Sequence, residues 1–200
     1  MPESFFGAVG FIIQKYGSLF ASGTVTTLIV ALTGTVLGFA VGLLVAIGRT
    51  TEAGEGAGPA KRGLVRLFHG FLGFYIEVFR GTPMIVQAMV IYYGAMQYLG
   101  LKMPNLVAAI LIVSVNTGAY MAEIIRGAII SVDSGQTEAA HSIGMTHWQT
   151  MTSVVLPQAI RNIMPSIGNE FIVNIKDSSV LNVISVSELF FQSKSAAGTY

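Results

Sequence analysis

The chain has 200 residues, of which 52% are apolar and 10% are charged, and its net charge at pH 7 is +1. The mean hydropathy of +0.67 exceeds that of ordinary soluble domains and predicts a membrane protein. The small net charge excludes electrostatic attraction as a basis for nucleic-acid binding, and a chain without cysteine has no disulfides or cysteine-ligated metals. We expect a single transmembrane domain over residues 1–200, because this length leaves no room for a separate soluble catalytic domain.

The first predicted elements are a weak apolar helix and a strong membrane span. Residues 5–20 contain Gln14 and Lys15, so we expect an amphipathic helix at the membrane surface, within an extracytoplasmic amino-terminal segment 1–20. Residues 24–47 carry no charge. About 24 residues at about 1.5 Å each reach about 36 Å, which is enough to cross a hydrocarbon core of about 30 Å.

Three glycines in this span follow a repeated GxxxG pattern: Gly34, Gly38 and Gly42. Such a pattern predicts close contact with another helix. The pattern fits a helix of the same chain and a helix of a second copy equally well.

The second apolar stretch, residues 64–99, is interrupted by four residues: Arg80, Gly81, Thr82 and Pro83. Thr82 can cap a helix and Pro83 is favoured at the first helical position, so we expect a new helix to start there. Broken helices inside a membrane occur where they are buried or line a cavity. Alternatively, Arg80 simply marks the cytoplasmic boundary of the span.

Two further apolar stretches follow, at residues 106–125 and 160–191. Together with the first two they predict an all-α membrane protein, a polytopic helical bundle with about four spans. Basic residues are concentrated after the first span and after the third, at Arg49, Lys61, Arg62, Arg66, Arg126 and Arg161, whereas the connection before the third span holds only Lys102. The positive-inside rule then places the amino terminus outside a multi-pass cell-membrane protein.

The segment 133–157 is more polar than its surroundings and shows helix signals twice. Asp133 can cap a first helix, with Gln136 in the reciprocal position, and Gly144 can end it in a left-handed turn. Thr146 and Gln149 form a second capping box, and Leu156-Pro157 predicts the end of the second helix. We expect two short cytoplasmic helices, which serve either as an elbow between spans or as a docking element.

Several motifs resemble one transporter family. Glu138-Ala139-Ala140, followed by Gly144 and by Val154-x-Leu156-Pro157, resembles the EAA coupling motif of ABC importer permeases, in which isoleucine usually stands at the position of Val154. "VFRGTPMIVQAMVIYYG" (78–94), "AYMAEIIRGAI" (119–129) and "GNEFIVNIKDSSVLNVISVSEL" (168–189) resemble the permeases of polar amino acid ABC importers. The resemblance implies the fold of the small importer permeases, normally with five spans, of which this chain would show four.

The resemblance also implies partners. The residues expected to couple to a cytoplasmic ATP-binding subunit are Glu138, Ala139, Ala140, Gly144, Met145 and Trp148. A second permease subunit, identical or different, and an extracytoplasmic amino acid-binding protein or domain are implied as well. ATP and Mg would be bound by the partner ATPase, so no cofactor is expected in this chain.

Ionisable groups inside a membrane are costly, about 2.5–3.5 kcal/mol each on insertion scales, and therefore indicate function or pairing. In the last apolar stretch Glu170, Asn174 and Asp177 share a helical face, with Lys176 beside them, and in the third Asn116, Tyr120 and Glu123 do the same. We expect these faces to line a substrate path, in which Glu170 contacts the substrate ammonium group. The alternative is pairing between helices, such as Glu123 with Arg126 or Lys176 with a carboxylate.

The predicted function is that of a transmembrane permease subunit of an ATP-driven amino acid importer. We expect no enzyme activity, because the glycine-rich "EAGEGAGPAKRG" lacks the GxxxxGK[ST] pattern of a phosphate-binding loop. The three histidines lack the spacing of metal ligands. The alternative function is an ion-coupled secondary transporter or channel with Glu170, Lys176 and Asp177 as an ion relay, although the surface helix pair and the lack of an inverted repeat disfavour it.

Overall fold

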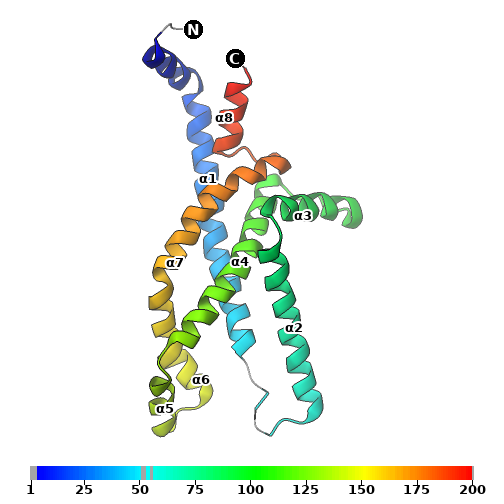
Figure 1. Ribbon diagram of the computed structural model, residues 1–200. Helices are drawn as coiled ribbons and strands as arrows, with labels where there is room; N and C mark the ends of the chain where they lie inside the picture. The colour runs from blue at the N-terminus through cyan, green and yellow to red at the C-terminus, as the bar shows by residue number, and fades with distance from the viewer. Residues whose placement is uncertain (1–3, 51–52, 55, 200) are drawn as a thin grey trace. The chain divides into compact units, whose positions relative to one another are not determined.

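The computed structural model describes residues 4–50, 53–54 and 56–199, and these residues form helices and connections but no strand (Figure 1). The predicted all-α fold class is confirmed. The elements are α1 Phe5–Thr50, α2 Pro59–Gly81, α3 Met84–Leu99, α4 Asn105–Ser131, α5 Ser134–Ser142, α6 His147–Thr150, the π-helix η1 Met151–Val155, α7 Leu156–Asp177, the 3₁₀-helix η2 Ser178–Ile184 and α8 Leu189–Ala197. They divide into two compact units, and α1, α4 and α7 each contribute to both.

The first unit contains the part of α1 up to Gly34, residues 84–113 and the chain from Ile172 onward. Its core combines α1, α3, α4 and η2, with the buried residues Val30, Ala88, Ala108, Ala109, Ile112, Val113, Leu181, Ile184 and Val186. Two hydrogen bonds hold the end of η2: the Tyr93 hydroxyl donates to the carbonyl of Val183 at 2.9 Å, and the Asn105 amide donates to that of Ser185 at 3.1 Å. These bonds secure the turn at Ser185, whose φ is 60°.

Helix α8 belongs to the same unit and lies beside α1 (Figure 1). Its cap is Glu188, which is buried and accepts hydrogen bonds from the backbone amides of Phe190 and Phe191. A carboxylate suits this position because the first amides of a helix have no intrahelical acceptor and the helix dipole is positive there. A Cβ on Gly23 of α1 would lie 2.9 Å from the Cα of Leu189, so the two backbones approach closely.

The second unit contains residues 35–83 and 114–171, that is, the rest of α1 and α4, all of α2, α5, α6 and η1, and most of α7. One core cluster joins α1 to α4 and α7 through Ala46, Met121, Ile125, Ala128, Ile129, Val155, Leu156, Ala159 and Ile163. A smaller cluster joins α2 to α1 and α4 through Val45, Leu72, Ile76 and Ala122. Lipid is as apolar as these side chains, so within a membrane the clusters stabilise the unit chiefly through close van der Waals packing.

The glycine pattern of α1 makes its contact within this chain, against α4. In the second unit a Cβ on Gly38 would lie 2.6 Å from the Cβ of Thr117, and one on Gly42 would lie 2.5 Å from that of Met121. In the first unit a Cβ on Gly34 would lie 2.4 Å from Cγ1 of Val113. Glycine is therefore required at each of the three positions, because a side chain of α4 leaves no room for a Cβ. The close contact that the pattern predicts is thus made with a helix of the same chain.

Two predicted boundaries are wrong. Residues 5–20 and 24–47 do not form separate helices but one helix of 46 residues, because nothing between them breaks the hydrogen-bond ladder and Gly23 is itself helical. Residues 160–191 do not form one span, because α7 gives way to η2 and then to α8 after the left-handed turn at Ser185.

Within the described residues, α1 and α4 are each long and apolar enough to cross a membrane. Helices α2 and α3 count as a third span if the pair, broken at Thr82-Pro83, is taken as one. The number of span-like helices is therefore two or three, below the predicted four. That the 200 residues behave as one domain stays a prediction.

Candidate functional site: the coupling helices and the polar faces

Helix α5 begins as its sequence predicts. The carboxylate of Asp133 accepts a hydrogen bond from the backbone amide of Gly135 at 2.7 Å, which satisfies one of the free amides of the first turn. Gln136 does not complete the predicted box, because its side-chain oxygen instead accepts from the amide of Gln158 at 3.4 Å. This bond ties the start of α5 to the start of α7 inside the second unit.

The end of α5 is a left-handed turn at Gly144, as predicted. Gly144 has φ of 85°, and its amide donates to the carbonyl of His141 at 2.9 Å. The next amide, that of Met145, donates to the carbonyl of Ala140 at 3.1 Å. These two bonds make a Schellman motif, which needs a positive φ that glycine adopts without strain.

Helix α6 opens with the predicted capping box. The Thr146 hydroxyl accepts from the backbone amide of Gln149, and the Gln149 side chain accepts from the amide of Thr146 at 2.8 Å. The predicted end of this helix at Leu156-Pro157 is wrong, because the chain stays helical from His147 to Asp177.

A π turn explains how the helix passes Pro157. In α-helical register the proline ring would clash with the carbonyl four residues earlier and would leave that carbonyl without its amide partner. Residues Met151–Val155 adopt π register instead, and the amide of Leu156 donates to the carbonyl of Met151, five residues back. The wider turn accommodates Pro157, so α6 is continuous with α7.

The turn between α5 and α6 presents an exposed surface of mixed character. Glu138, Ala139 and Gly144 are exposed, and the apolar side chains of Ile143 and Trp148 are 79% and 63% exposed. Exposed large apolar side chains beside small residues mark a surface suited to a protein partner. Two details differ from expectation. Ala140 is buried, so of the two alanines only Ala139 is open to a partner. Ile143 belongs to the exposed surface, although it is not among the predicted coupling residues.

The predicted break of the second apolar stretch lies where the sequence places it. Helix α2 ends at Gly81 and α3 begins at Met84, so Pro83 precedes the first helical residue and does not occupy it. The Thr82 hydroxyl donates to the carbonyl of Val78 at 2.8 Å. Arg80 and Gly81 close the last turn of α2.

The end of α2 is held against the polar face of α4. The amide of Asn116 donates to the carbonyl of Phe79 at 3.3 Å, and the guanidinium of Arg80 lies over the ring of Tyr120, 5.5 Å from its centre. One helical turn earlier, the hydroxyl of Tyr75 donates to the carbonyl of Val115 at 2.6 Å. The end of α2 at the break is therefore attached directly to the polar face of α4. From the sequence the two features had been predicted separately.

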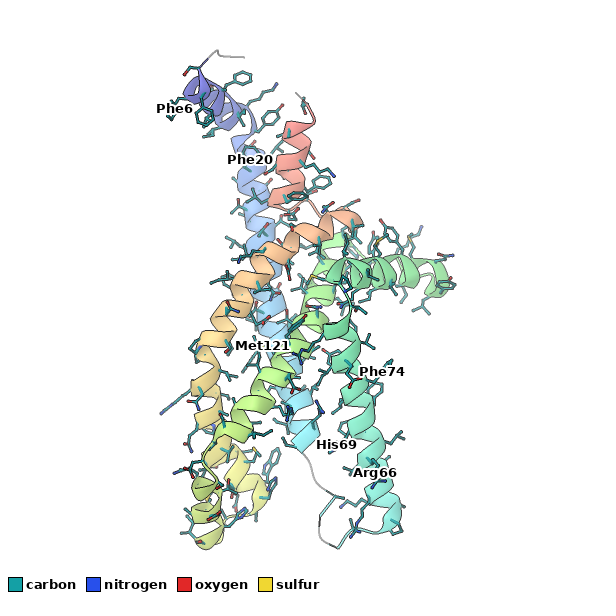
Figure 2. The ribbon with its side chains drawn as sticks, in the orientation of Figure 1. Phe6, Phe20, Arg66, His69, Phe74 and Met121 are labelled. Carbon is teal, nitrogen blue, oxygen red and sulfur yellow. The ribbon has the colours of Figure 1, made fainter. Side chains whose placement is uncertain are left out.

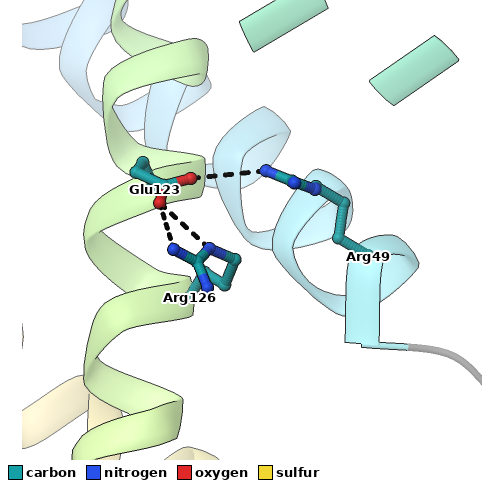
Figure 3. A network of polar contacts seen from close by, with 3 residues as sticks. All are labelled: Arg49, Glu123 and Arg126. Carbon is teal, nitrogen blue, oxygen red and sulfur yellow. Dashed lines mark hydrogen bonds and ion pairs between the residues drawn. The ribbon is translucent and has the colours of Figure 1, made fainter. Parts of the chain in front are cut away.

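Glu123 is paired on both sides, as Figure 3 shows. Its Oε2 accepts from Nη1 of Arg49 at 3.4 Å, and its Oε1 accepts from Nε of Arg126 at 3.0 Å and also from Nη2 of Arg126. The pairing with Arg126 confirms the alternative considered for Glu123. The contact with Arg49 was missed, because no local pattern relates residues 74 positions apart.

The predicted path residues belong to different units. Asn116, Tyr120 and Glu170 are in the second unit, and Asn174, Lys176 and Asp177 are in the first. Asn174 is 2% exposed, Glu170 and Asp177 are half-buried, and Lys176 is exposed. A shared polar cavity and the pairing of Lys176 stay predictions.

Comparison with known proteins identifies the family. The model of the family described as "binding-protein-dependent transport system inner membrane component" matches residues 53–197. The chain belongs to this family. The family is one of multi-pass membrane transport components and not of catalytic enzymes, and the described helices fit it.

Two similar proteins are permease proteins of amino acid transport systems. The glutamine transport system permease protein GlnP of Escherichia coli K12 is 41% identical over 133 residues, which are 64% of this chain and 61% of that protein. The arginine transport system permease protein ArtQ of Bacillus subtilis is 34% identical over 179 residues, 89% of this chain and 76% of that protein. The matched region thus spans less than two thirds of the length of GlnP.

Solved structures share the fold. A chain in the crystal structure of an amino acid ABC transporter with histidines is 36% identical, with a TM-score of 0.79 over 100% of this chain and 92% of that one. A chain of an inward-facing MetNI methionine ABC transporter is 22% identical with a TM-score of 0.70, a likeness that concerns the fold alone. The fold of this family member is therefore that of the ABC importer permeases.

Proposed function

We propose that this chain is the membrane-spanning permease subunit of an ATP-driven amino acid importer. The observation that carries the proposal is the α5–α6 turn, a rigidly capped helix pair whose exposed surface holds apolar side chains at Ile143 and Trp148. Exposed apolar groups on a fixed scaffold suit a permanent partner. The similarity to glutamine and arginine permeases supports a polar amino acid as substrate.

In this proposal the helix pair docks on a cytoplasmic ATP-binding subunit, which binds the ATP and Mg. Contacts come from Glu138, Ala139, Gly144, Met145 and Trp148, while Ala140 supports the surface from beneath. Because α6, η1 and α7 form one continuous helix, movement of the docked end is carried into α7. The nucleotide-bound ATPase must hold one state of the permease more tightly than the other, since only differential binding shifts a conformational equilibrium.

The substrate path of the proposal runs along Asn116, Tyr120 and Glu170, with further polar groups at Asn174, Lys176 and Asp177. Glu170 contacts the substrate ammonium group. A second permease subunit completes the path, and an extracytoplasmic binding protein or domain delivers the amino acid. The amino terminus lies outside, because the basic residues after α1 favour the cytoplasm.

The test is ATP-dependent uptake of glutamine and arginine into proteoliposomes that contain this chain and its ATPase, comparing Gly144→Val with Gly54→Val. Both glycines have positive φ, 85° and 80°, and a Cβ on either meets nothing within 4 Å, so both variants suffer the same backbone strain. Only Gly144 lies in the helix pair. We expect Gly144→Val to lose uptake and ATPase association together, and Gly54→Val to keep both.

Equal uptake by the two variants would show that the α5–α6 turn is a structural elbow. ATP-independent uptake driven by an ion gradient would favour the alternative of an ion-coupled transporter or channel. None of the relatives described above is of that kind.

A further inference from the structure

The face of α2 opposite its core contacts carries a groove that contains none of the proposed path or coupling residues. It has a volume of about 580 Å³ and is lined by Gly63, Arg66, Leu67, Gly70, Phe71 and Phe74. At 100° per residue these positions fall on one side of the helix, whereas Leu72 and Ile76 point the other way, into the core cluster with α1 and α4. Figure 2 shows Arg66 and Phe74 on this helix.

Two glycines form the floor of the groove. A Cβ added to Gly63 or Gly70 meets nothing within 4 Å, so neither residue is required by packing within this chain. Helical periodicity places Arg66 along one side of this floor and Leu67 and Phe71 along the other. The apolar wall is open, since Leu67 is 72% exposed and Phe71 is 67% exposed.

The same end of α2 is strongly basic. Lys61, Arg62 and Arg66 are exposed, and α2 contains no acidic residue before Glu77. None of the three cations forms an ion pair with another residue in the described part of the chain. Arg62 and Arg66 are four residues apart and are therefore neighbours on the helix surface.

We propose that this groove binds an anionic phospholipid, with one acyl chain over Gly63 and Gly70 and the phosphate between Arg62 and Arg66. The apolar floor accepts a hydrocarbon chain, and guanidinium groups bind phosphate through paired hydrogen bonds. Cations that form no ion pair within the described residues, at the edge of an apolar face, favour an anionic headgroup over a second apolar helix. The assignment does not depend on the transport function.

The test is native mass spectrometry of the purified full-length chain in detergent, titrated with dioleoyl phosphatidylglycerol or dioleoyl phosphatidylcholine. We expect one tightly retained phosphatidylglycerol and about tenfold weaker retention of phosphatidylcholine. Arg66→Gln should weaken retention of phosphatidylglycerol about tenfold, the usual effect of losing a charged hydrogen bond. Arg161→Gln is the matched control, because it also removes an exposed cation.

Gly70→Leu tests the acyl site separately from the charge. It should remove the retained lipid of either headgroup, whereas Gly127→Leu, at an exposed helical glycine of α4 with nothing near its Cβ, should not. Variants that elute as monodisperse protein count as folded. The proposal is overturned if the two lipids are retained equally, if Arg66→Gln behaves like Arg161→Gln, or if a second copy of the chain covers the groove and excludes lipid.

Discussion

Arg49 and Glu123 join the last turn of α1 to α4, with Nη1 3.4 Å from Oε2, and Arg126 approaches the same carboxylate from its other side. All three side chains are about 30% exposed, so the charges are only partly desolvated. The cluster carries a net charge of +1 from two cations and one anion. Glu123 is therefore the residue that lets two arginines lie close together.

Glu123→Gln should lower the free energy of unfolding by about 1 kcal/mol, because the two guanidinium groups would then repel each other across a partly screened gap. High salt should reduce the loss. The measurement is thermal unfolding in detergent at low and high salt. Glu77→Gln is the control, since Glu77 is exposed on α2, and a loss as large in this variant would contradict the prediction.

Gly38→Ala should destabilise the protein by about 1–3 kcal/mol, because the new Cβ would lie 2.6 Å from the Cβ of Thr117 and force α1 away from α4. Gly127→Ala, with open space around its Cβ, should instead gain about 0.5–1 kcal/mol from the better helix propensity of alanine. Thermal unfolding of both variants checks whether Gly38→Ala lowers the stability of the protein while Gly127→Ala raises it. Two changes of the same sign would mean that the α1–α4 contact tolerates a wider separation.

Trp148 is the only tryptophan of the chain and is 63% exposed, so its fluorescence reports on the proposed docking surface. Addition of a tryptophan-free ATPase subunit should shift its emission to shorter wavelength and reduce quenching by acrylamide. Gly144→Val should abolish the shift. An unchanged spectrum on formation of a stable complex would place the ATPase elsewhere on the chain.

Glu170→Gln should reduce amino acid uptake at least tenfold while leaving the ATPase bound, because a neutral amide loses the charge-assisted bond to the substrate ammonium group. Uptake into proteoliposomes and co-purification of the ATPase are the two readouts. Glu77→Gln should leave both unchanged. Full uptake by Glu170→Gln would remove this residue from the substrate path.

Local features of the structure could be predicted from the sequence, and distant ones could not. The turn at Gly144 and the Thr146–Gln149 capping box depend on neighbouring residues, and both form as predicted. The contacts of Tyr75 with Val115 and of Arg49 with Glu123 join separate helices, and no spacing rule reveals them. Glu188 was missed for a similar reason, since a carboxylate in an apolar stretch shows its capping role only once α8 is seen to begin there.

Element boundaries predicted from apolar composition and from proline were also wrong where hydrogen-bond geometry determines the structure. Residues 160–191 are apolar enough to suggest one span, but the left-handed Ser185 and the buried cap at Glu188 divide them. Pro157 suggested a helix end, and the π turn before it allowed the helix to continue. Hydropathy contains no information on such hydrogen-bond registers.

The π turn also preserves a rotational phase. A π turn holds one residue more than an α turn, so it takes up an extra residue and leaves the helical phases on its two sides almost unchanged. The same extra residue in continuous α register would rotate everything on its amino-terminal side by about 100° relative to α7. The direction in which Trp148 faces, and with it the proposed docking surface, is therefore set by the register of this one turn.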